Sequence, residues 1–377
     1  MKIVYFSDSF LPIVDGVGNV VYQYAYNMAN MDNEVYVVAP QADTGYRGSM
    51  PFEIIDYVGV KAPVMKSYKV GTPVLDAHCI NRLRMIKPDI VHVHSPFTAG
   101  QAGLVYAKRN KVPVIGTFHS KYYDDFYEVS KSEIVAEVGS KAVKEFFNQC
   151  REVWTVSNGS AEELHNYGYK KDIVIIENGT DPRPLADEAA RRVSKQYALG
   201  SSLVLLYVGQ INRKKNIKTI IEAFSMIEGD VKLVLAGQGP HLKEMQEHAK
   251  KCKVADRTIF TGYIGDREDM MGLYRRAELF VFPSLYDTSG LVVREAATQE
   301  TPSVVVRRTA AAECIKDWLN GFLCDNDPDS LANVIIEALS DTDRLKTIGK
   351  KAKDTIPIPW NVIMKQAMDR YTEVING

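Results

Sequence analysis

The sequence predicts an α/β fold with two doubly wound domains, in which each mostly parallel sheet is covered by helices on both faces. Three observations support this prediction. The chain has 377 residues, which is long for a single hydrophobic core. Short apolar strands alternate with longer helical stretches, as in right-handed β-α-β units, and this rhythm starts again after Gly179.

Apolar runs place the elements in order along both halves. In the first half a helix is expected over 17–31, and the predicted strands are 2–7, 34–39, 90–94, 112–117 and 153–157. In the second half the predicted strands are 203–208, 231–236, 258–261, 279–282 and 303–306.

Turn-forming residues crowd the segment Asn178–Pro184, which is the expected linker between the halves. We therefore predict a first domain over 1–182 and a second over 183–356. Residues 357–377 are expected to form a final helix, and packing against the first domain is one option for it. Two doubly wound domains that face each other create a central cleft at the carboxyl ends of their strands, where ligands bind in open α/β sheets.

Composition and charge exclude several classes of protein. The formal net charge of −1 provides no basic field for nucleic acid, and 46% hydrophobic residues argue against disorder. Asp8 and Asp15 interrupt the N-terminus too early for a signal peptide, and no apolar run reaches the roughly 18 residues of a spanning helix. Five cysteines without a CxxC pair are expected to be free thiols. The sequence predicts a cytoplasmic protein, with peripheral attachment to the inner face of the membrane left open.

Glycines follow the first strand in the segment Asp15-Gly-Val-Gly18. Such glycines let backbone N–H groups approach a phosphate at the start of a helix, which makes Gly16 a candidate phosphate-binding residue. A nicotinamide-dependent oxidoreductase would need a glycine in place of Val21, an acidic residue where the second strand ends in Ala39-Pro40, and a shorter loop. A glycine turn without a ligand fits the segment equally well.

Histidines stand at the ends of two predicted strands, in His92-Val-His94 and at His119. His92 and His94 share a strand face, as a metal-binding pair would, but no third ligand is near in the sequence. Closing of the strand end is therefore the preferred interpretation. His119 is expected to face the cleft, and capping of its turn is the alternative.

The acidic run Asp325–Asp329 has the spacing of the start of a calcium loop but lacks the glycine and the glutamate that such a loop needs. It is interpreted as a turn in which Asp329 is the N-cap of a helix. No metal site is predicted.

Two strand-to-helix junctions in the second half give the strongest indication of a site. The segment Gly209–Asn216 contains three consecutive basic side chains at 213–215, and Pro283–Glu295 brings Asp287 and Glu295 to the start of a helix. Lysines beside one helix N-terminus and free N–H groups at another can bind a diphosphate. The two carboxylates could accept hydrogen bonds from sugar hydroxyls. The alternatives are a solvated basic face and simple helix capping.

The segment Pro283–Pro302 resembles the donor-site signature of the retaining glycosyltransferases of family 4, also called group 1, in which two acidic residues enclose seven others. Asp287 and Glu295 take the two acidic places. Further segments that match landmarks of that family are Gly209–Asn216, Ala236–Pro240, Thr261–Tyr263, Glu313 and Asn320-Gly321. Segments of the first half that are similar to bacterial diacylglycerol glucosyltransferases are Phe6–Pro12, His94–Phe97 and Thr117–Ser120. The resemblance extends over nearly the whole chain.

This resemblance implies the GT-B architecture of two Rossmann-like domains, and a metal-independent transfer of a hexose, with retention, to a hydroxyl acceptor. It implies no cofactor, because a nucleotide-diphosphate sugar is the donor substrate, and a UDP-sugar is favoured. The residues implied to act on the sugar are His119, Asp287 and Glu295. The residues assigned to the donor phosphates are Gly16, Arg213, Lys214, Lys215, Gly290 and Leu291. The residues assigned to the nucleotide are Gly209, Thr261, Gly262, Tyr263 and Glu295.

The chain departs from the family pattern at two positions. Gln210 stands where the family commonly has an arginine, which removes one cation from the phosphate site unless Arg213 or Lys214 replaces it. Asp287 stands where glutamate is usual, and its side chain is one methylene shorter. These departures keep a rival interpretation open, in which the chain is a non-catalytic sugar-nucleotide-binding subunit that stabilises an active partner.

The acceptor is open between a lipid, a surface polysaccharide and a protein-linked glycan. Four apolar residues recur at helical spacing, namely Ile134, Val138, Ala142 and Phe146. The stretch Tyr57–Val70 carries aromatic residues together with Lys61, Lys66 and Lys69. Both patterns are compatible with contact to a membrane surface. Core packing of the apolar stripe and a solvated loop at the lysines are the preferred interpretations.

Overall fold

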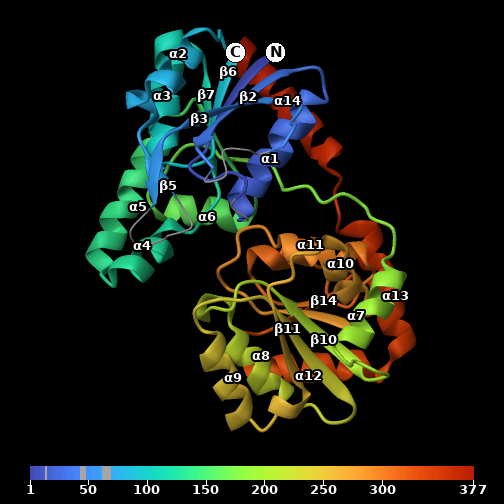
Figure 1. Ribbon diagram of the computed structural model, residues 1–377. Coiled ribbons are helices and arrows are strands. Elements are labelled where there is room, and N and C mark those ends of the chain that lie inside the picture. Colours follow the sequence, from blue (N-terminus) through green and yellow to red (C-terminus); the bar gives the residue numbers. More distant parts are fainter. Residues whose placement is uncertain (13–14, 43–47, 62–68) are drawn as a thin grey trace. The chain divides into compact units, whose positions relative to one another are not determined.

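The computed structural model describes residues 1–12, 15–42, 48–61 and 69–377, which form two compact units (Figure 1). The first unit consists of Met1–Asn178 together with Trp360–Gly377, and the second of Gly179–Pro359. The chain first passes from one unit to the other after residue 178, whereas the boundary predicted from the sequence lay after residue 182. The two crossing segments are joined, because the backbone N–H of Thr180 donates to the carbonyl oxygen of Ile358 at 2.7 Å.

The first unit is built around a parallel sheet of seven strands in the order β3-β2-β1-β6-β7-β8-β9. The strands are β1 (Lys2–Phe6), β2 (Glu34–Pro40), β3 (Glu53–Tyr57), β6 (Ile90–Val93), β7 (Val114–Phe118), β8 (Glu152–Thr155) and β9 (Val174–Ile175). The strand order reverses between β1 and β6, so their carboxyl ends form the switch point at which such sheets bind ligands. The inner strands are largely buried on both faces because helices cover both sides.

Helices cover this sheet from both sides. They are α1 (Gly16–Ala29), α2 (Ala77–Arg84), α3 (Thr98–Asn110), α4 (Tyr122–Ser130), α5 (Glu133–Asn148), α6 (Asn158–Asn166) and α14 (Trp360–Asn376), with the short 3-10 turn η1 (Pro73–Leu75). Figure 1 shows α1 and α14 side by side on one side of the sheet, and α2 and α3 on the other.

The final helix, α14, packs on the first unit through buried aromatic contacts and ion pairs. Tyr371 is fully buried, and its ring stacks on Trp154 with centroids 5.2 Å apart. Its hydroxyl lies 2.6 Å from Nδ1 of His92. Arg370 forms an ion pair with Glu152 of β8. The end of the chain thus completes the core of the first unit.

The second unit has a parallel sheet of six strands in the order β12-β11-β10-β13-β14-β15, with its switch point between β10 and β13. The strands are β10 (Leu203–Val208), β11 (Val231–Ala236), β12 (Thr258–Gly262), β13 (Leu279–Phe282), β14 (Ser303–Val306) and β15 (Phe322–Cys324). The helices are α7 (Asp187–Gln196), α8 (Ile217–Phe224), α9 (Leu242–Lys251), α10 (Arg267–Arg276), α11 (Leu291–Thr298), α12 (Pro328–Ser340) and α13 (Thr342–Thr355), with the 3-10 turns η2 (Arg213–Lys215), η3 (Ala255–Arg257) and η4 (Ala310–Ala312).

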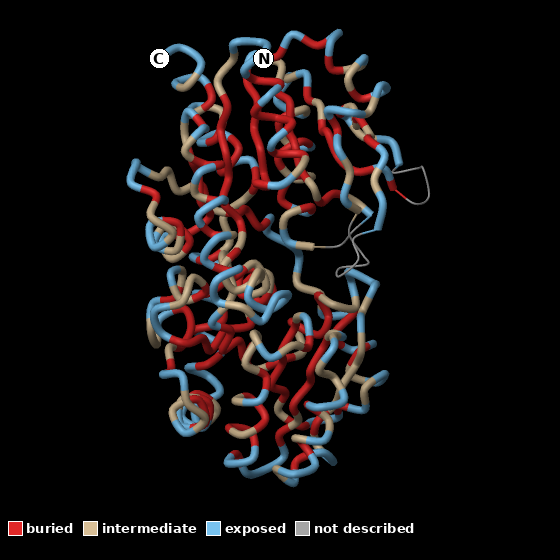
Figure 2. Tube along the Cα trace, turned by 90° about the vertical axis from the view of Figure 1, so that its left-hand side faces the viewer, coloured by how far each residue is buried: buried red, intermediate tan, exposed pale blue. Residues whose placement is uncertain are grey.

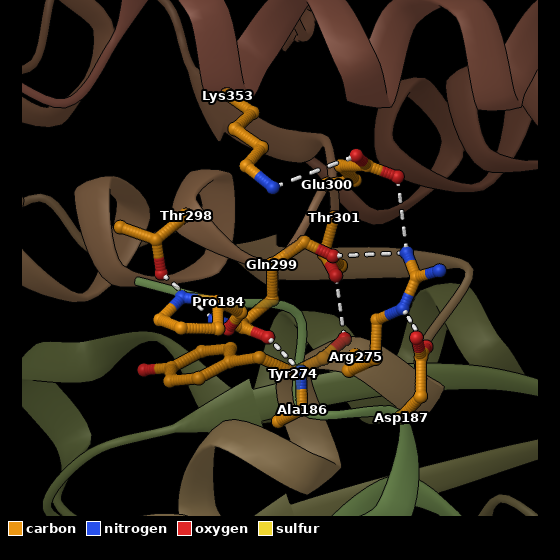
Figure 3. A network of polar contacts seen from close by, with 10 residues as sticks. All are labelled: Pro184, Ala186, Asp187, Tyr274, Arg275, Thr298, Gln299, Glu300, Thr301 and Lys353. Atoms are coloured by element: carbon orange, nitrogen blue, oxygen red, sulfur yellow. Dashed lines mark hydrogen bonds and ion pairs between the residues drawn. The ribbon is translucent and has the colours of Figure 1, made fainter. Parts of the chain in front are cut away.

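A polar network fixes the ends of α10 and α11 to the segment that enters the second unit (Figure 3). The buried amide of Gln299 accepts from the backbone N–H of Ala186 at 2.9 Å and donates to the carbonyl oxygen of Pro184 at 3.2 Å. Arg275 bridges Asp187 and Glu300. Because these groups are paired inside the unit, the two helices have a fixed relation to each other and to α7.

Two predictions about local structure are wrong, one for the stretch Tyr57–Val70 and one for the N-cap of α12. The stretch Tyr57–Val70 is not only a loop, because β4 (Gly59–Lys61) and β5 (Lys69–Gly71) pair as an antiparallel hairpin. Lys66 lies outside the described residues. The N-cap of α12 is Asp327 rather than Asp329, since Pro328 takes the first helical position, where a missing N–H costs nothing. In the part of the chain that the structure describes, no helix is long and apolar enough to cross a membrane.

Replacement of Tyr371 by Ala is expected to lower the free energy of unfolding of the first unit by about 3–5 kcal/mol, because it leaves a cavity beneath α14. Tyr371→Phe keeps the ring and removes only the hydroxyl, so it is expected to cost about 1–3 kcal/mol. Urea unfolding followed by tryptophan fluorescence measures both values. Tyr127→Ala, at an exposed tyrosine of α4, is the control and should change stability by less than about 0.5 kcal/mol. Equal losses for Ala and Phe at Tyr371 would contradict the packing role.

Candidate functional site

Both predicted donor segments begin where β10 and β13 end, at the switch point of the second sheet. After β10 the backbone turns at Gly209 with a φ of 151°, which favours glycine. A Cβ at Gly237, after β11, would lie 1.9 Å from the carbonyl oxygen of Gly209. The loops that follow β10 and β11 therefore pack backbone against backbone, and side chains are excluded from this contact.

The three consecutive basic residues after β10 have different partners. Arg213 is largely exposed and forms an ion pair with a glutamate of α9 at 2.9 Å. The ammonium of Lys214 lies 4.3 Å from the centre of the Tyr286 ring. Lys215 donates from Nζ to Oδ2 of Asp287 at 2.9 Å, and both side chains are mostly buried. The structure thus joins the two predicted donor segments through Lys215 and Asp287.

The carboxylate of Asp287 also fixes the turn before α11. Its Oδ1 accepts from the backbone N–H of Gly290 at 2.6 Å and from that of Ser289 at 3.2 Å. Burial acts to raise the pKa of Asp287, but the charge and hydrogen bond of Lys215 and the two backbone N–H groups outweigh it, so the pKa lies below its ordinary value. Asp287 is therefore an anion at neutral pH. The N–H of Gly290, predicted to bind donor phosphates, is engaged by Asp287, and Leu291 is the first residue of α11.

Glu295 lies on α11 and is held by two side chains of α10. Its Oε1 accepts from Nη2 of Arg267 at 2.6 Å, and its Oε2 lies 3.3 Å from the hydroxyl of Tyr274. Each carboxylate oxygen has a second lone pair, so Glu295 can accept further hydrogen bonds in this orientation. Sequence reasoning missed Arg267 and Tyr274 because only the packing of α10 on α11 brings these distant positions together.

The segment predicted to bind the base, Thr261–Tyr263, spans the end of β12. The carbonyl oxygen of Gly262 accepts from the backbone N–H of Gly237 at 2.9 Å and from the hydroxyl of Thr261 at 3.0 Å. The φ of 73° at Gly262 favours glycine, and the ring of Tyr263 is exposed. Because Gly237 also contacts Gly209, the predicted nucleotide-binding segments form one connected set of loops.

Gln210, which replaces the usual family arginine, is turned toward its own loop. Its Oε1 accepts from Nδ2 of Asn212 at 2.7 Å. Of the two cations considered as substitutes, Arg213 is paired with Glu244. Lys214 packs on Tyr286, the residue that precedes Asp287 in the chain.

In the first unit, Asp8 joins the two strands of the switch point. It follows β1, and its Oδ2 accepts from the hydroxyl of Ser95 at 2.5 Å. Its Oδ1 accepts from the hydroxyl of Thr98 at 2.7 Å and from the backbone N–H of Ala99 at 2.9 Å, at the start of α3. Sequence reasoning gave Asp8 no role, although an acidic residue directly after the first strand was the available signal.

Gly16 opens α1, the helix that follows β1. The carboxylate of Asp15 accepts from the backbone N–H of Gly18 at 2.6 Å and also pairs with the hydroxyl of Ser9. A Cβ at Gly16 would meet no atom within 4 Å, so the position does not need glycine for space. Contact of Gly16 with a phosphate stays a prediction.

His92, His94 and His119 form a buried cluster at the ends of β6 and β7. The hydroxyls of Tyr371 and Thr117 each lie 2.6 Å from a ring nitrogen of His92. Nδ1 of His94 lies 3.0 Å from Nε2 of His119. The rings of His92 and His94 stack with centroids 4.1 Å apart. Among the described residues, no group of three or more histidine, cysteine or acidic side chains is arranged to hold a metal ion.

All three imidazoles are neutral at neutral pH. Burial lowers the pKa of His119 to about 3 and lowers the pKa values of His92 and His94 well below the ordinary range. Repulsion from the neighbouring rings adds to the effect of burial at His92 and His94. Each ring therefore carries one N–H proton. The hydrogen bonds of the cluster determine whether that proton is on Nδ1 or on Nε2.

Core packing was the preferred interpretation of the apolar stripe on α5. It is wrong for three of the four residues of that stripe. Phe146 is buried, but Ala142 is exposed, and the side chains of Ile134 and Val138 are 76% and 62% exposed. The buried face of α5 consists of Ala136, Ser140, Val143, Phe146 and Phe147. Gly139 faces α4, because the ring of Phe126 packs so closely on it that a Cβ there would lie 2.3 Å from the ring. In Figure 2 buried residues (red) gather in the interior of each unit, and exposed residues (pale blue) lie along its outside.

Two family models match the chain, one in each half. The model described as Glycosyl transferases group 1 matches residues 191–355, and the model described as Glycosyltransferase Family 4 matches residues 14–183. The chain belongs to glycosyltransferase family 4. It is accordingly an enzyme of the hexosyltransferase class.

Curated relatives of this family-4 chain act on different substrates. A GDP-mannose-dependent alpha-mannosyltransferase of Corynebacterium glutamicum is 26% identical over 392 residues, which cover 100% of this chain and 89% of that protein. Alpha-monoglucosyldiacylglycerol synthases of Streptococcus pneumoniae and Acholeplasma laidlawii are 26% and 25% identical. The matches cover 90% and 100% of this chain, and 78% and 98% of those proteins.

Solved structures show that the fold is GT-B, with two Rossmann-like domains. Sucrose-phosphate synthase from Thermosynechococcus elongatus has a TM-score of 0.81 at 21% identity, with 100% of this chain and 99% of that chain covered. Anabaena HepE in complex with UDP and glucose has a TM-score of 0.78 at 18% identity, with 99% and 100% covered.

The stability of the first unit is expected to fall as the pH drops from about 6.5 to 5. The three cluster histidines have lower pKa values in the folded state than in the unfolded chain, so the unfolded chain takes up protons first. Their contribution is fully present above the unfolded pKa and is lost below it, by up to about 1.4 kcal/mol per pH unit for each ring. Urea unfolding of a Trp318→Phe variant, whose remaining tryptophans lie in the first unit, measures the slope. A flat stability between these pH values would show that the rings are not buried as neutral groups.

Proposed function

We propose that this family-4 enzyme transfers a hexose from a nucleotide-diphosphate sugar to a hydroxyl acceptor, with retention at the anomeric carbon and without a metal ion. The observation that carries the proposal is the convergence of Lys215, Asp287 and the start of α11 at the carboxyl ends of β10 and β13. A cation beside a helix N-terminus suits a diphosphate, and fixed carboxylates suit sugar hydroxyls.

The transfer breaks the bond between the anomeric carbon and the leaving phosphate oxygen, so negative charge grows on the diphosphate. Lys215 supplies a positive charge in a mostly buried position, where electrostatic interactions are stronger than in water. The helix dipole of α11 adds positive potential at Leu291. These groups are preorganised by the hydrogen bonds of Asp287, so the protein itself stabilises the leaving group.

Glu295 is proposed to bind the ribose, because Arg267 and Tyr274 hold its two oxygens in one plane and leave lone pairs for two adjacent hydroxyls. Asp287 is proposed to accept from the hydroxyls of the donor sugar, and His119 is proposed to act on the sugar. We propose a UDP-sugar as the first donor to test. Support comes from the solved complex of HepE with UDP and glucose, whereas the mannosyltransferase relative is named for GDP-mannose.

Lys215→Ala is expected to lower kcat/KM for transfer by about 100-fold or more, because it removes the cation at the leaving diphosphate. Glu295→Gln is expected to raise KM for the donor by about 10-fold to 100-fold through the loss of a charged acceptor. Release of nucleoside diphosphate measures the rate, and a thermal-shift panel of UDP-, GDP- and ADP-sugars first identifies the donor.

Lys218→Ala is the matched control, since Lys218 is an exposed lysine of α8 in the same region of the chain. It should leave the rate close to that of the unmodified protein. The rate is also expected to be unchanged by a chelator, and the product should keep the anomeric configuration of the donor. Tight binding of a sugar nucleotide with no turnover would favour the non-catalytic subunit instead.

We also propose that the acceptor is presented at a lipid surface. The observation behind this proposal is the apolar outer face of the α4–α5 hairpin, where Val129, Ile134 and Val138 are exposed near Lys131 and Lys141. Two of the curated relatives are named as synthases of monoglucosyldiacylglycerol.

The double variant Ile134→Ser, Val138→Ser is expected to reduce binding to vesicles by about 10-fold or more, because two large apolar side chains no longer enter the bilayer. Co-sedimentation with vesicles that contain phosphatidylglycerol measures the binding. Ile336→Ser, at a half-exposed isoleucine of α12, is the control and should bind like the unmodified chain. If the unmodified chain does not sediment with any vesicle, a soluble glycan acceptor is favoured.

A further inference from the structure

His94 has no direct role in the proposed reaction, yet its two ring nitrogens have very different surroundings. Nδ1 lies 3.0 Å from Nε2 of His119. Nε2 is fully buried and has no hydrogen-bond partner among the residues that the structure describes. The ring is enclosed by Tyr5, Tyr24 and His92, whose ring centres lie 5.5, 5.4 and 4.1 Å away.

A single proton lies between His94 and His119. Both imidazoles are neutral, because burial disfavours their charged forms. A neutral imidazole has one N–H donor and one acceptor nitrogen. Either His94 donates from Nδ1 to His119, or His119 donates from Nε2 to His94. The first arrangement leaves Nε2 of His94 as a bare acceptor, and the second places an N–H there.

The surroundings of Nε2 separate these two arrangements. A buried N–H without an acceptor is rarer in proteins than an acceptor with an unused lone pair. A contact of this N–H with one of the surrounding aromatic rings would be the competing interaction, but such contacts are weak. We therefore propose that His94 donates its Nδ1 proton to Nε2 of His119, and so acts as a positioning residue that fixes His119 as the tautomer with its proton on Nδ1.

The fixed tautomer determines which ligand atoms His119 can recognise. With Nε2 occupied by His94, the nitrogen left for a ligand is Nδ1, and it is a hydrogen-bond donor. His119 is 6% exposed, so a ligand can contact it. Its partner would be an acceptor oxygen, such as a sugar hydroxyl or an anionic oxygen. This last step rests on the proposed function, whereas the tautomer itself does not.

The direct experiment is a long-range 1H–15N correlation spectrum of the full chain, labelled at histidine nitrogen, at pH 7.5. The signals of His119 and His94 are assigned from the spectra of His119→Gln and His94→Gln. We expect a protonated Nδ1 and a bare Nε2 in both rings. A protonated Nε2 in His119 would overturn the proposal. The tautomer itself is measured in the unmodified chain, and the two variants serve only to assign its signals.

Substitutions at His94 test the positioning role. His94→Leu removes the donor, so His119 should lose its single tautomer, and kcat/KM for transfer should fall about threefold to tenfold. His94→Asn places an amide N–H near the position of Nδ1 and should restore both the tautomer and the rate. An equal loss of rate in the Leu and Asn variants, with no change in the His119 signals, would assign His94 to packing alone.

His92→Gln is the matched control within the same cluster. It removes the ring that stacks on His94 but leaves the contact between His94 and His119, so the His119 tautomer should be unchanged. A change of tautomer in this variant would contradict the role given to His94.

The assignment of His94 and the proposed function can each be contradicted without the other. If the spectra show the expected tautomer and no donor supports turnover, the proposed function fails and the assignment of His94 stands. If transfer occurs and the tautomer is reversed, the assignment of His94 fails and the proposed function stands.

Discussion

The ion pair between Lys215 and Asp287 bridges the two strands at which the second sheet reverses its order. Both side chains are mostly buried, so neither charge is well solvated without the other. Asp287 uses its second oxygen to hold the turn before α11, and α11 in turn carries Glu295. The position of the donor loops, the start of the helix and the second carboxylate therefore all depend on one partly buried pair. The shorter side chain of aspartate is compatible with this arrangement, because it reaches the lysine and the backbone N–H groups at the same time.

The first unit meets the same structural demand with different chemistry. Its sheet also reverses next to the first strand, and Asp8 spans the gap by bonding to side chains and to the backbone at the start of α3. There the anion accepts from hydroxyl and N–H donors at a helix N-terminus. In both units a carboxylate after a central strand connects that strand to its neighbour across the switch point. The second unit adds a lysine, which makes its switch point suited to a phosphate as well.

The alternation of strands and helices was sufficient to predict the central strands of both sheets, because buried parallel strands have long apolar runs. The edge strands β3, β9 and β15 are short or partly polar and gave no such signal, whereas the edge strand β12 was predicted. The donor segments were predictable because local motifs carry them, and the structure joins them at Lys215 and Asp287. Arg267 and Tyr274 could not be predicted, since their contact with Glu295 arises from the packing of two helices. The stripe on α5 was misjudged because its period shows that one face is apolar, but not that the neighbouring face, with Ala136, Ser140, Val143 and Phe147, is the packed one.

The place of α14 in the first unit has a consequence for the order in which the protein is made. Ribosomes release a chain from its N-terminus, and domains commonly fold in that order as they emerge. Here the N-terminal unit lacks its last helix until all of the other unit has been synthesised. During that interval the surface around Trp154 and His92 has no Tyr371 to cover it. The second unit, which is continuous in sequence, is thus the one able to finish folding first.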